Sequence, residues 1–266
     1  MLSEALAWLL TPATVRARRL GYLAESIAIA ARHRRCRQAW APHLAASRRA
    51  LLDSARAAPG RGIALVLGSG HLLDVPLDEL AALFGQVWLV DVVHPWPARR
   101  AARRYGNVRL ISADVTGCLD RLPAWPEPPG LFLAEPGIDW VASVNLLSQL
   151  ARLPEAWLRT RQASWPADKV AEFGTVLARQ HLAWLARFRA PVCVLADLEQ
   201  VHLDGAGGEL ERRDLRPLLA GWRLAADWRW DLAPAGELAH GESAYHRVGA
   251  LYQHGQDEDQ DDVGQT

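Results

Sequence analysis

The chain has 266 residues, half of them hydrophobic, and its 30 basic and 30 acidic side chains give a formal net charge of zero. Such a chain can bury the core of one large α/β domain with an appendage, and its length requires no second catalytic domain. Its three cysteines, Cys36, Cys118 and Cys193, are far apart in sequence and fit neither a disulfide framework nor a zinc-ligand spacing, which indicates a reducing compartment.

The amino-terminal part of the chain, residues 1–57, is predicted to form a helical extension. Met1 to Leu10 is apolar, but this segment contains Glu4 and is too short to span a bilayer, so we expect a cytoplasmic protein that contacts no membrane. Thr11 and Pro12 mark a helix start, and the apolar residues that follow fall on the faces of two helices. The extension also holds ten arginines against three acids.

An adenosine-containing ligand is indicated by the segment that follows. Residues 63–67 predict a buried strand, which ends at the turn Gly68-Ser69-Gly70. Residues 74–84 have apolar side chains at helical spacing, with Asp74 as the predicted N-cap, and a second buried strand then ends on Asp91. This order places a ligand at the carboxyl ends of parallel strands, where glycines let the backbone approach and an acid reaches ribose hydroxyls.

Strands and helices alternate through the rest of the chain, which favours a parallel sheet. A carboxylate, Asp114, follows the third predicted strand, and Asn145 follows the fourth. The residues from Arg152 to Pro166 look irregular. The last two strands have no helix between them and predict an antiparallel hairpin. The predicted elements are a basic helix over 94–104, strands over 108–111, 138–144 and 192–197, a long helix over 168–188, and hairpin strands over 222–232 and 244–252.

These elements divide the chain into three parts. Residues 1–57 are the helical extension, which we expect to lie as a partial lid over the carboxyl edge of the sheet, and residues 58–254 are the α/β domain. Residues 255–266 are acidic and nearly without apolar side chains, so they are expected to form a disordered tail.

The ordered features of residues 60–253 resemble those of class I S-adenosylmethionine-dependent methyltransferases: the glycine turn, Asp91, Asp114, the segment Ser143-Val144-Asn145 and the terminal hairpin. The resemblance implies a mostly parallel, seven-stranded Rossmann-like sheet and S-adenosylmethionine as the cofactor. It also implies the cofactor-binding residues: Gly68, Ser69 and Gly70 at the methionine and ribose, Asp91 at both ribose hydroxyls, Asp114 and Val115 at the adenine, and Asn145 facing the sulfonium and the substrate.

Four side chains are candidates for a part in the reaction. Asn145 offers a donor and an acceptor beside the expected cofactor. His71 follows the first strand, while Glu199 and His202 follow the fifth, and each of the three is a candidate general base. The alternative for each is structural: Asn145 ends a strand, His71 is a hydrogen-bonded surface histidine, and Glu199 and His202 belong to a solvated loop. For Asp114 the alternative is a helix cap.

Several functions remain open at this stage. The leading one is methyl transfer to an unidentified small molecule or protein side chain. A non-catalytic sensor or partner protein that binds an adenosine ligand is favoured by Val66 and Leu72, which stand where the family's turn has an acid and a third glycine. An NAD-dependent oxidoreductase is a lesser alternative, because Gly68 and Gly70 begin the dinucleotide fingerprint and Asp91 follows about 20 residues on. An aminobutyryl transferase is a minor one. The arginines of the extension make nucleic acid a further, less favoured partner.

Overall fold

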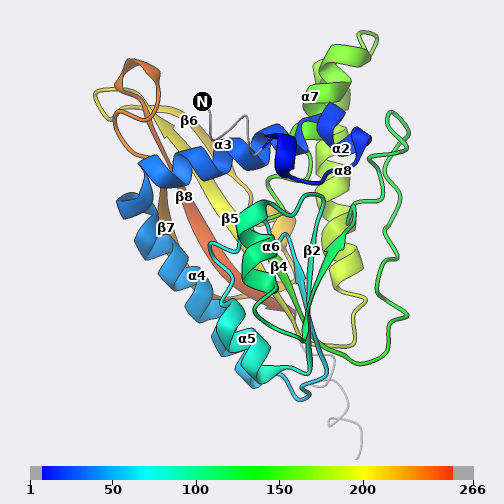
Figure 1. Cartoon of the computed structure of the whole chain (residues 1–266). Coiled ribbons are helices and arrows are strands. Elements are labelled where there is room, and N and C mark those ends of the chain that lie inside the picture. Colours follow the sequence, from blue (N-terminus) through cyan, green and yellow to red (C-terminus); the bar gives the residue numbers. More distant parts are fainter. Residues whose placement is uncertain (1–7, 254–266) are drawn as a thin grey trace, which may run out of the picture.

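The computed structural model describes residues 8–253, which form one eight-stranded sheet with helices on both faces (Figure 1). Its strand order is β3-β2-β1-β4-β5-β8-β7, and β6 pairs with β5 outside this path. The strands are β1 (Ile63–Leu67), β2 (Gln86–Asp91), β3 (Val108–Ser112), β4 (Ile138–Val144), β5 (Val192–Leu203), β6 (Glu209–Asp214), β7 (Trp222–Ala233) and β8 (Ser243–Gln253). The helices are α2 (Val15–Leu20), α3 (Tyr22–Arg35), α4 (Arg37–Ala57), α5 (Leu77–Leu83), α6 (Trp96–Ala102), α7 (Arg152–Arg161), α8 (Ala167–Leu185) and the 3₁₀ turns η1 (Arg216–Leu219) and η2 (Ala239–Gly241).

Strands β1 to β5 pair in parallel, whereas β8 runs antiparallel between β5 and β7. All five residues of β1 are buried, as expected for the central strand of a parallel sheet that is covered on both faces. The strand order and the antiparallel terminal pair confirm the expected mostly parallel, Rossmann-like sheet with an antiparallel C-terminal hairpin. The sheet has eight strands rather than the seven predicted, because β6 adds a hairpin to the extended end of β5.

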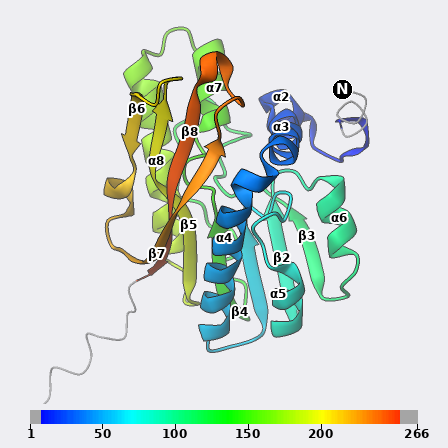
Figure 2. The same ribbon diagram turned by 90° about the vertical axis from the view of Figure 1, so that its left-hand side faces the viewer.

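The two faces of the sheet have separate cores. On one face, Leu51 of α4 and Leu80 of α5 pack with Val66 of β1, and all three are fully buried. The other face packs against α7 and α8, with Leu158 and Phe173 as fully buried contacts. Figure 2 shows α4 and α5 side by side along the first face. Alternation of side chains along each strand therefore supplies both cores from the same strands.

The amino-terminal helices lie in two different places. Side chains of α3 reach the carboxyl edge of the parallel strands, whereas α4 lies along the sheet, where its Ser54 Oγ accepts a hydrogen bond from the Trp140 indole N–H at 3.0 Å. The proposed boundary at residue 57 stays a prediction, but α4 packs on the same sheet as the helices that follow. The predicted acidic tail lies outside the described residues. Among residues 8–253, no helix is long and apolar enough to cross a bilayer.

Three local predictions were wrong. The helix expected to start at Thr11 and Pro12 is α2, which begins after Thr14, whose hydroxyl accepts the Ala17 N–H. Helix α5 begins at Leu77 after Pro76, so Asp74 is not its N-cap. The segment expected to be irregular contains α7, because Pro154 occupies the first turn, where its missing N–H leaves no helical hydrogen bond unmade.

Candidate functional site

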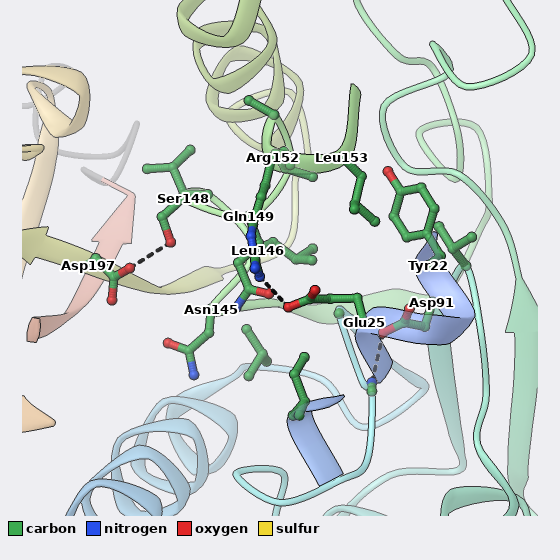
Figure 3. A pocket seen from close by; sticks show the side chains of 18 of the residues that line it. Tyr22, Glu25, Asp91, Asn145, Leu146, Ser148, Gln149, Arg152, Leu153 and Asp197 are labelled. Carbon is green, nitrogen blue, oxygen red and sulfur yellow. Dashed lines mark hydrogen bonds and ion pairs between the residues drawn. The ribbon is translucent and has the colours of Figure 1, made fainter. Parts of the chain in front are cut away.

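A cavity of about 600 Å³ lies at the carboxyl ends of the parallel strands. A volume of this size falls in the range that holds a small molecule or cofactor. Its lining comes from the glycine turn, from the ends of β2, β3 and β4, from α3 and α4, and from β5, β7 and β8. Figure 3 shows part of this lining from close by. The residues predicted to bind the cofactor all lie here: Gly68, Ser69, Gly70, Asp91, Asp114, Val115 and Asn145.

The glycine turn is fixed by its backbone. Gly68 has φ of +77°, and a Cβ atom there would lie 2.5 Å from Leu146 Cγ, so only glycine fits. At Gly70, with φ of +44°, a Cβ would lie in ordinary contact, 3.8 Å from Asp91 Oδ2. Leu72, which stands at the family's third glycine, also has a positive φ, +60°. The backbone therefore keeps a left-handed conformation at this position although the side chain is leucine.

Asp91 lies at the end of β2 beside this turn. Its Oδ2 accepts the Gly70 N–H at 2.8 Å, and its Oδ1 accepts the Val93 N–H at 3.3 Å (Figure 3). Burial raises the pKa of Asp91 above its ordinary value, and these N–H groups together with His94 offset part of that rise. Two backbone donors orient the carboxylate and leave acceptor capacity on both oxygens for a ligand.

Asp114 accepts more hydrogen bonds than Asp91 does. Its Oδ1 accepts both the N–H and the hydroxyl of Thr116, at 2.9 and 2.5 Å, and its Oδ2 accepts the Leu119 N–H at 2.9 Å. The side chain therefore stabilises the turn after β3. The alternative that Asp114 caps a helix is wrong, because residues 113–137 form turns and no helix. Asp114 and Val115 still line the cavity, so contact with an adenine stays a prediction.

Asn145 ends β4 in a left-handed conformation, with φ of +50°, which asparagine tolerates better than most residues. Its Nδ2 donates to Asp74 Oδ2 at 2.6 Å, while its Oδ1 is buried and finds no partner among residues 8–253. Burial raises the pKa of Asp74, and the Asn145 amide opposes that rise. An orphaned acceptor that lines a cavity is an available contact for a ligand.

Helix α3 closes one side of the cavity. Figure 3 shows Tyr22 over Asp91, and burial together with the negative charge of Asp114 and Asp91 raises the pKa of the Tyr22 hydroxyl. Glu25 forms an ion pair with Arg152 at the start of α7. His71 does not stand free, because its Nε2 lies 3.0 Å from Ser26 Oγ and 2.8 Å from the Ser26 carbonyl oxygen. The contact of His71 with Ser26 thus joins α3 to the segment that follows the glycine turn.

A second polar group lines the cavity beyond Asn145, on β5 just past the residues that pair with β4. Asp197 is 5% exposed, and its Oδ2 accepts from Ser148 Oγ at 2.6 Å and from the Gln200 amide at 2.9 Å. Its Oδ1 lies 3.1 Å from His246 Nδ1. Burial disfavours the carboxylate, but the contacts with His246, Ser148 and Gln200 outweigh burial and lower the pKa of Asp197. The group is therefore ionised at neutral pH.

Glu199 and His202, two of the candidate general bases, do not line this cavity. Leu198 is an extra residue in the pairing of β5 with β8, and this bulge turns Glu199 away from the side that carries Asp197. Glu199 instead forms an ion pair with Arg212 at 2.7 Å. His202 Nε2 lies 3.0 Å from Glu242 Oε2, and His202 borders a smaller cavity that shares Gln200, Arg213 and His246 with the larger one.

Aromatic side chains line the same region as Asp197. His43 of α4 stacks on Trp230 with ring centroids 4.1 Å apart, and Trp230 meets Trp40 edge to face at 5.1 Å. The Trp228 indole N–H donates to His43 Nδ1 at 3.0 Å, which leaves the proton of the neutral ring on Nε2. Burial lowers the pKa of His43 to about 4, despite the negative charge of Asp197. His43 is thus neutral at physiological pH.

Sequence reasoning missed Tyr22, Asp74, Asp197 and His246 as cavity residues. Of these, Asp197 had the clearest sequence signal, because it is the acid that directly follows the apolar run from Val192 to Ala196. Tyr22 and His246 carry no comparable local signal, because tertiary packing alone brings them to the cavity. Within residues 8–253, no group of histidine, cysteine, aspartate and glutamate side chains is arranged to hold a metal ion.

No protein-family model matches the chain, and no curated protein matches it. Several solved structures are similar to the chain. The N-methyltransferase NodS from Bradyrhizobium japonicum WM9, in complex with S-adenosyl-L-homocysteine, is 10% identical over 78% of this chain and 85% of its own, with a TM-score of 0.38. The 1,6-didemethyltoxoflavin-N1-methyltransferase from Burkholderia thailandensis is 15% identical over 92% of both chains, with a TM-score of 0.43. A SAM-dependent methyltransferase from Leishmania major is 14% identical over 92% of this chain and 81% of its own, with a TM-score of 0.35.

These identities are low, so the fold assignment rests on the strand order and strand directions of the sheet rather than on any one neighbour. The features that bear on function are those of the cavity.

Proposed function

We propose that this chain is an S-adenosylmethionine-dependent methyltransferase that acts on a small molecule. The observation that carries the proposal is the pairing of Asp91 with the glycine turn at the edge of the cavity. The Asp91 carboxylate accepts the Gly70 N–H while its remaining lone pairs are available to two ribose hydroxyls.

The chain's own residues fit such a cofactor. Gly68 and Gly70 let the backbone come close to the methionine and ribose portions, and the buried Ser69 hydroxyl has no partner within residues 8–253. The orphaned Oδ1 of Asn145 is a matching acceptor for a group at the methionine end. Val115 and Asp114 line the part of the cavity proposed for the adenine, although Asp114 contributes chiefly to the turn.

The bound cofactor would supply an activated methyl group. The chain would contribute binding and orientation, by holding that group in line with an acceptor nucleophile in a largely buried cavity. Tyr22, Trp40 and Trp230 would exclude water from the reacting groups.

Two observations favour this proposal over its alternatives. The antiparallel β8 between β5 and β7 is typical of methyltransferases rather than of NAD-dependent dehydrogenases. Several arginines of the helical extension are engaged within the chain, which favours a small molecule over nucleic acid. They include Arg16, which donates to the Leu119 carbonyl, Arg32, which pairs with Glu237, and Arg48, which donates to the Leu73 carbonyl. A non-catalytic binding protein remains the second candidate, because Val66 still replaces the family's acid.

Calorimetric titration of the purified chain with S-adenosylmethionine, S-adenosylhomocysteine and NAD tests the cofactor. We expect both adenosyl ligands to bind and NAD not to bind. Replacing Asp91 with Ala removes charged hydrogen bonds of about 1.5 to 3 kcal/mol, which corresponds to a roughly 10- to 150-fold increase in Kd. The matched control is Asp78→Ala, since Asp78 is an exposed acid paired with Arg104 away from the cavity.

Wild-type protein that binds neither adenosyl ligand at millimolar concentration contradicts the proposal. If the ligands bind but Asp91→Ala binds them as tightly as wild type, the cofactor is bound elsewhere in the cavity.

A further inference from the structure

We propose that the part of the cavity beyond Asn145 is the site of the methyl acceptor, and that His246, held by Asp197, is the base that takes the acceptor's proton. This inference rests on the proposed function and deepens it. We call this region the acceptor half, lined by Trp40, His43, Asp197, Trp230 and His246, and we call the region lined by Gly68, Gly70, Asp91 and Asp114 the cofactor half.

The position of the acceptor half follows from the sheet. β5, β8 and β7 lie on the far side of β4 from β1 and β2, so the acceptor half lies beside the cofactor half across the end of β4. Ser148 joins the two, because it closely follows Asn145 in the same loop and donates to Asp197 (Figure 3). The loop whose first residue is placed near the sulfonium thus also holds the carboxylate of the acceptor half.

The contact between Asp197 and His246 prepares the imidazole to accept a proton. His246 Nδ1 and Asp197 Oδ1 are within ion-pair distance, 3.1 Å, but their geometry is not that of a hydrogen bond. The carboxylate beside Nδ1 favours the proton of the neutral ring on that atom, which leaves an unshared electron pair on Nε2. The ionised carboxylate orients the ring and stabilises the imidazolium that forms. Asp197 is therefore a positioning residue, and its own hydrogen bonds from Ser148 and Gln200 fix its orientation.

His43 adds a neutral donor to the same half. Its Nε2, which carries the proton, is buried and finds no partner within residues 8–253. Asp197 and His246 are close enough to influence its charge. A buried donor without a partner costs free energy, which a ligand acceptor atom would recover.

The chemistry of this half defines the class of acceptor. Its aromatic walls, Trp40, His43 and Trp230, favour a planar apolar body, since flat rings stack and pack edge to face with such groups. Its polar groups favour one protic nucleophile on that body. A phenol meets both requirements, because its O–H can donate to His246 while its ring lies against Trp230.

The proposed step transfers the methyl group and one proton. The acceptor oxygen forms a bond to the methyl carbon, the bond from that carbon to sulfur breaks, and its electron pair stays on sulfur. The phenolic proton passes to Nε2 of His246, which becomes an imidazolium beside Asp197. Solvent later removes this proton, and S-adenosylhomocysteine and the methyl ether leave.

The test uses 4-nitrophenol, whose phenolate is coloured, with protein saturated in S-adenosylhomocysteine. It is performed at a pH below the pKa of free 4-nitrophenol. We expect the bound probe to absorb as phenolate. His246→Gln and Asp197→Asn should each reduce the bound phenolate fraction about tenfold or more, equivalent to one pKa unit, without changing the Kd for S-adenosylhomocysteine. The matched control is His202→Gln, since His202 lies on β5 outside this cavity and should leave the signal unchanged.

The outcomes separate the two proposals. If the protein binds S-adenosylhomocysteine but the probe stays protonated or does not bind, the acceptor proposal is overturned and the cofactor proposal stands. A phenolate signal that survives His246→Gln but is lost in Arg213→Gln overturns the role of His246, because the Arg213 guanidinium, which also lines the cavity, would then hold the anion. Failure to bind S-adenosylhomocysteine at all counts against the proposed function itself. The wild-type spectrum alone decides whether the probe ionises, so the test does not depend on every variant folding.

Discussion

The cofactor half and the acceptor half of the cavity are built in different ways. In the cofactor half, carboxylates are held by nearby backbone N–H groups: Asp91 accepts from Gly70 and Val93, and Asp114 accepts from Leu119. In the acceptor half, side chains from other segments hold two of the polar groups: Trp228 of β7 donates to His43 of α4, and Ser148 donates to Asp197 of β5. The cofactor half thus depends on the conformation of a few turns, whereas the acceptor half depends on the packing of α4 against the sheet.

This difference predicts which changes each half tolerates. Side-chain replacements in the cofactor half should alter ligand affinity and leave the turns in place, unless they touch a residue whose backbone conformation requires glycine. Replacements in the acceptor half should disturb several neighbours at once, because its hydrogen bonds cross between elements.

The largest expected effect is that of Gly68→Val. The added side chain would meet Leu146 Cγ at 2.5 Å and the Val144 carbonyl oxygen at 2.8 Å, and Gly68 has a positive φ. Backbone strain of this kind costs about 1 to 3 kcal/mol before the clash is counted. We expect urea unfolding to show that the free energy of unfolding falls by more than this range. We also expect calorimetry to show no binding of S-adenosylhomocysteine.

Gly236→Val is the control for this substitution. Gly236 has φ of +91°, but a Cβ atom there would meet no other atom within 4 Å, so the variant isolates backbone strain from the clash. If the two variants lose equal stability, the close approach of Leu146 to the turn is not what requires glycine at position 68.

The stability of the protein measured over a range of pH compares two buried histidines, His43 and His181. His43 belongs to the acceptor half, while His181 lies beneath β4, its Nε2 2.9 Å from Ser143 Oγ. Burial lowers the pKa of His43 to about 4 and that of His181 to about 3, both below the ordinary 6.5. The unfolded chain therefore binds protons that the folded chain does not, and the contribution to stability, complete above pH 6.5, is lost as the pH falls toward the folded values.

Each histidine should remove about 1.5 kcal/mol of stability between pH 6.5 and pH 5. Urea unfolding at both pH values measures the difference, and His43→Gln and His181→Gln should each reduce the difference by that amount. A variant that keeps the full wild-type difference would show that its histidine is protonated in the folded protein.

The smallest expected effect is at the ion pair between Glu25 and Arg152, which joins α3 to α7 at the cavity. The Arg152 side chain is more than half exposed, so solvent screens the pair and its coupling should be within about 1 kcal/mol. A double-mutant cycle with Glu25→Gln and Arg152→Gln, followed by urea unfolding at low and high salt, measures it. A coupling that is large and insensitive to salt would contradict this expectation and indicate a buried pair.

The sequence predicted the sheet and most of the cofactor half because their signals are local. A glycine turn between two buried strands and an acid at the end of the second all fall in one short stretch, from Ile63 to Asp91. The left-handed conformation of Leu72 was not predictable, because leucine is the wrong residue type for it and only the surrounding packing imposes it. The residues of the acceptor half could not be predicted from the sequence as one site either. His43 and His246 lie near opposite ends of the sequence, and neither belongs to a motif.

The bulge at Leu198 also affects how this chain should be aligned with others. One extra residue on β5 changes the side of the strand on which every later position lies, so Gln200 stands beside Asp197 where an unbroken strand would present Glu199. An ungapped alignment with a chain whose strand lacks this bulge would pair inward-facing residues with outward-facing ones from position 199 onward. Comparison of cavity residues with such a chain therefore needs a one-residue gap at Leu198, placed from coordinates rather than from sequence similarity.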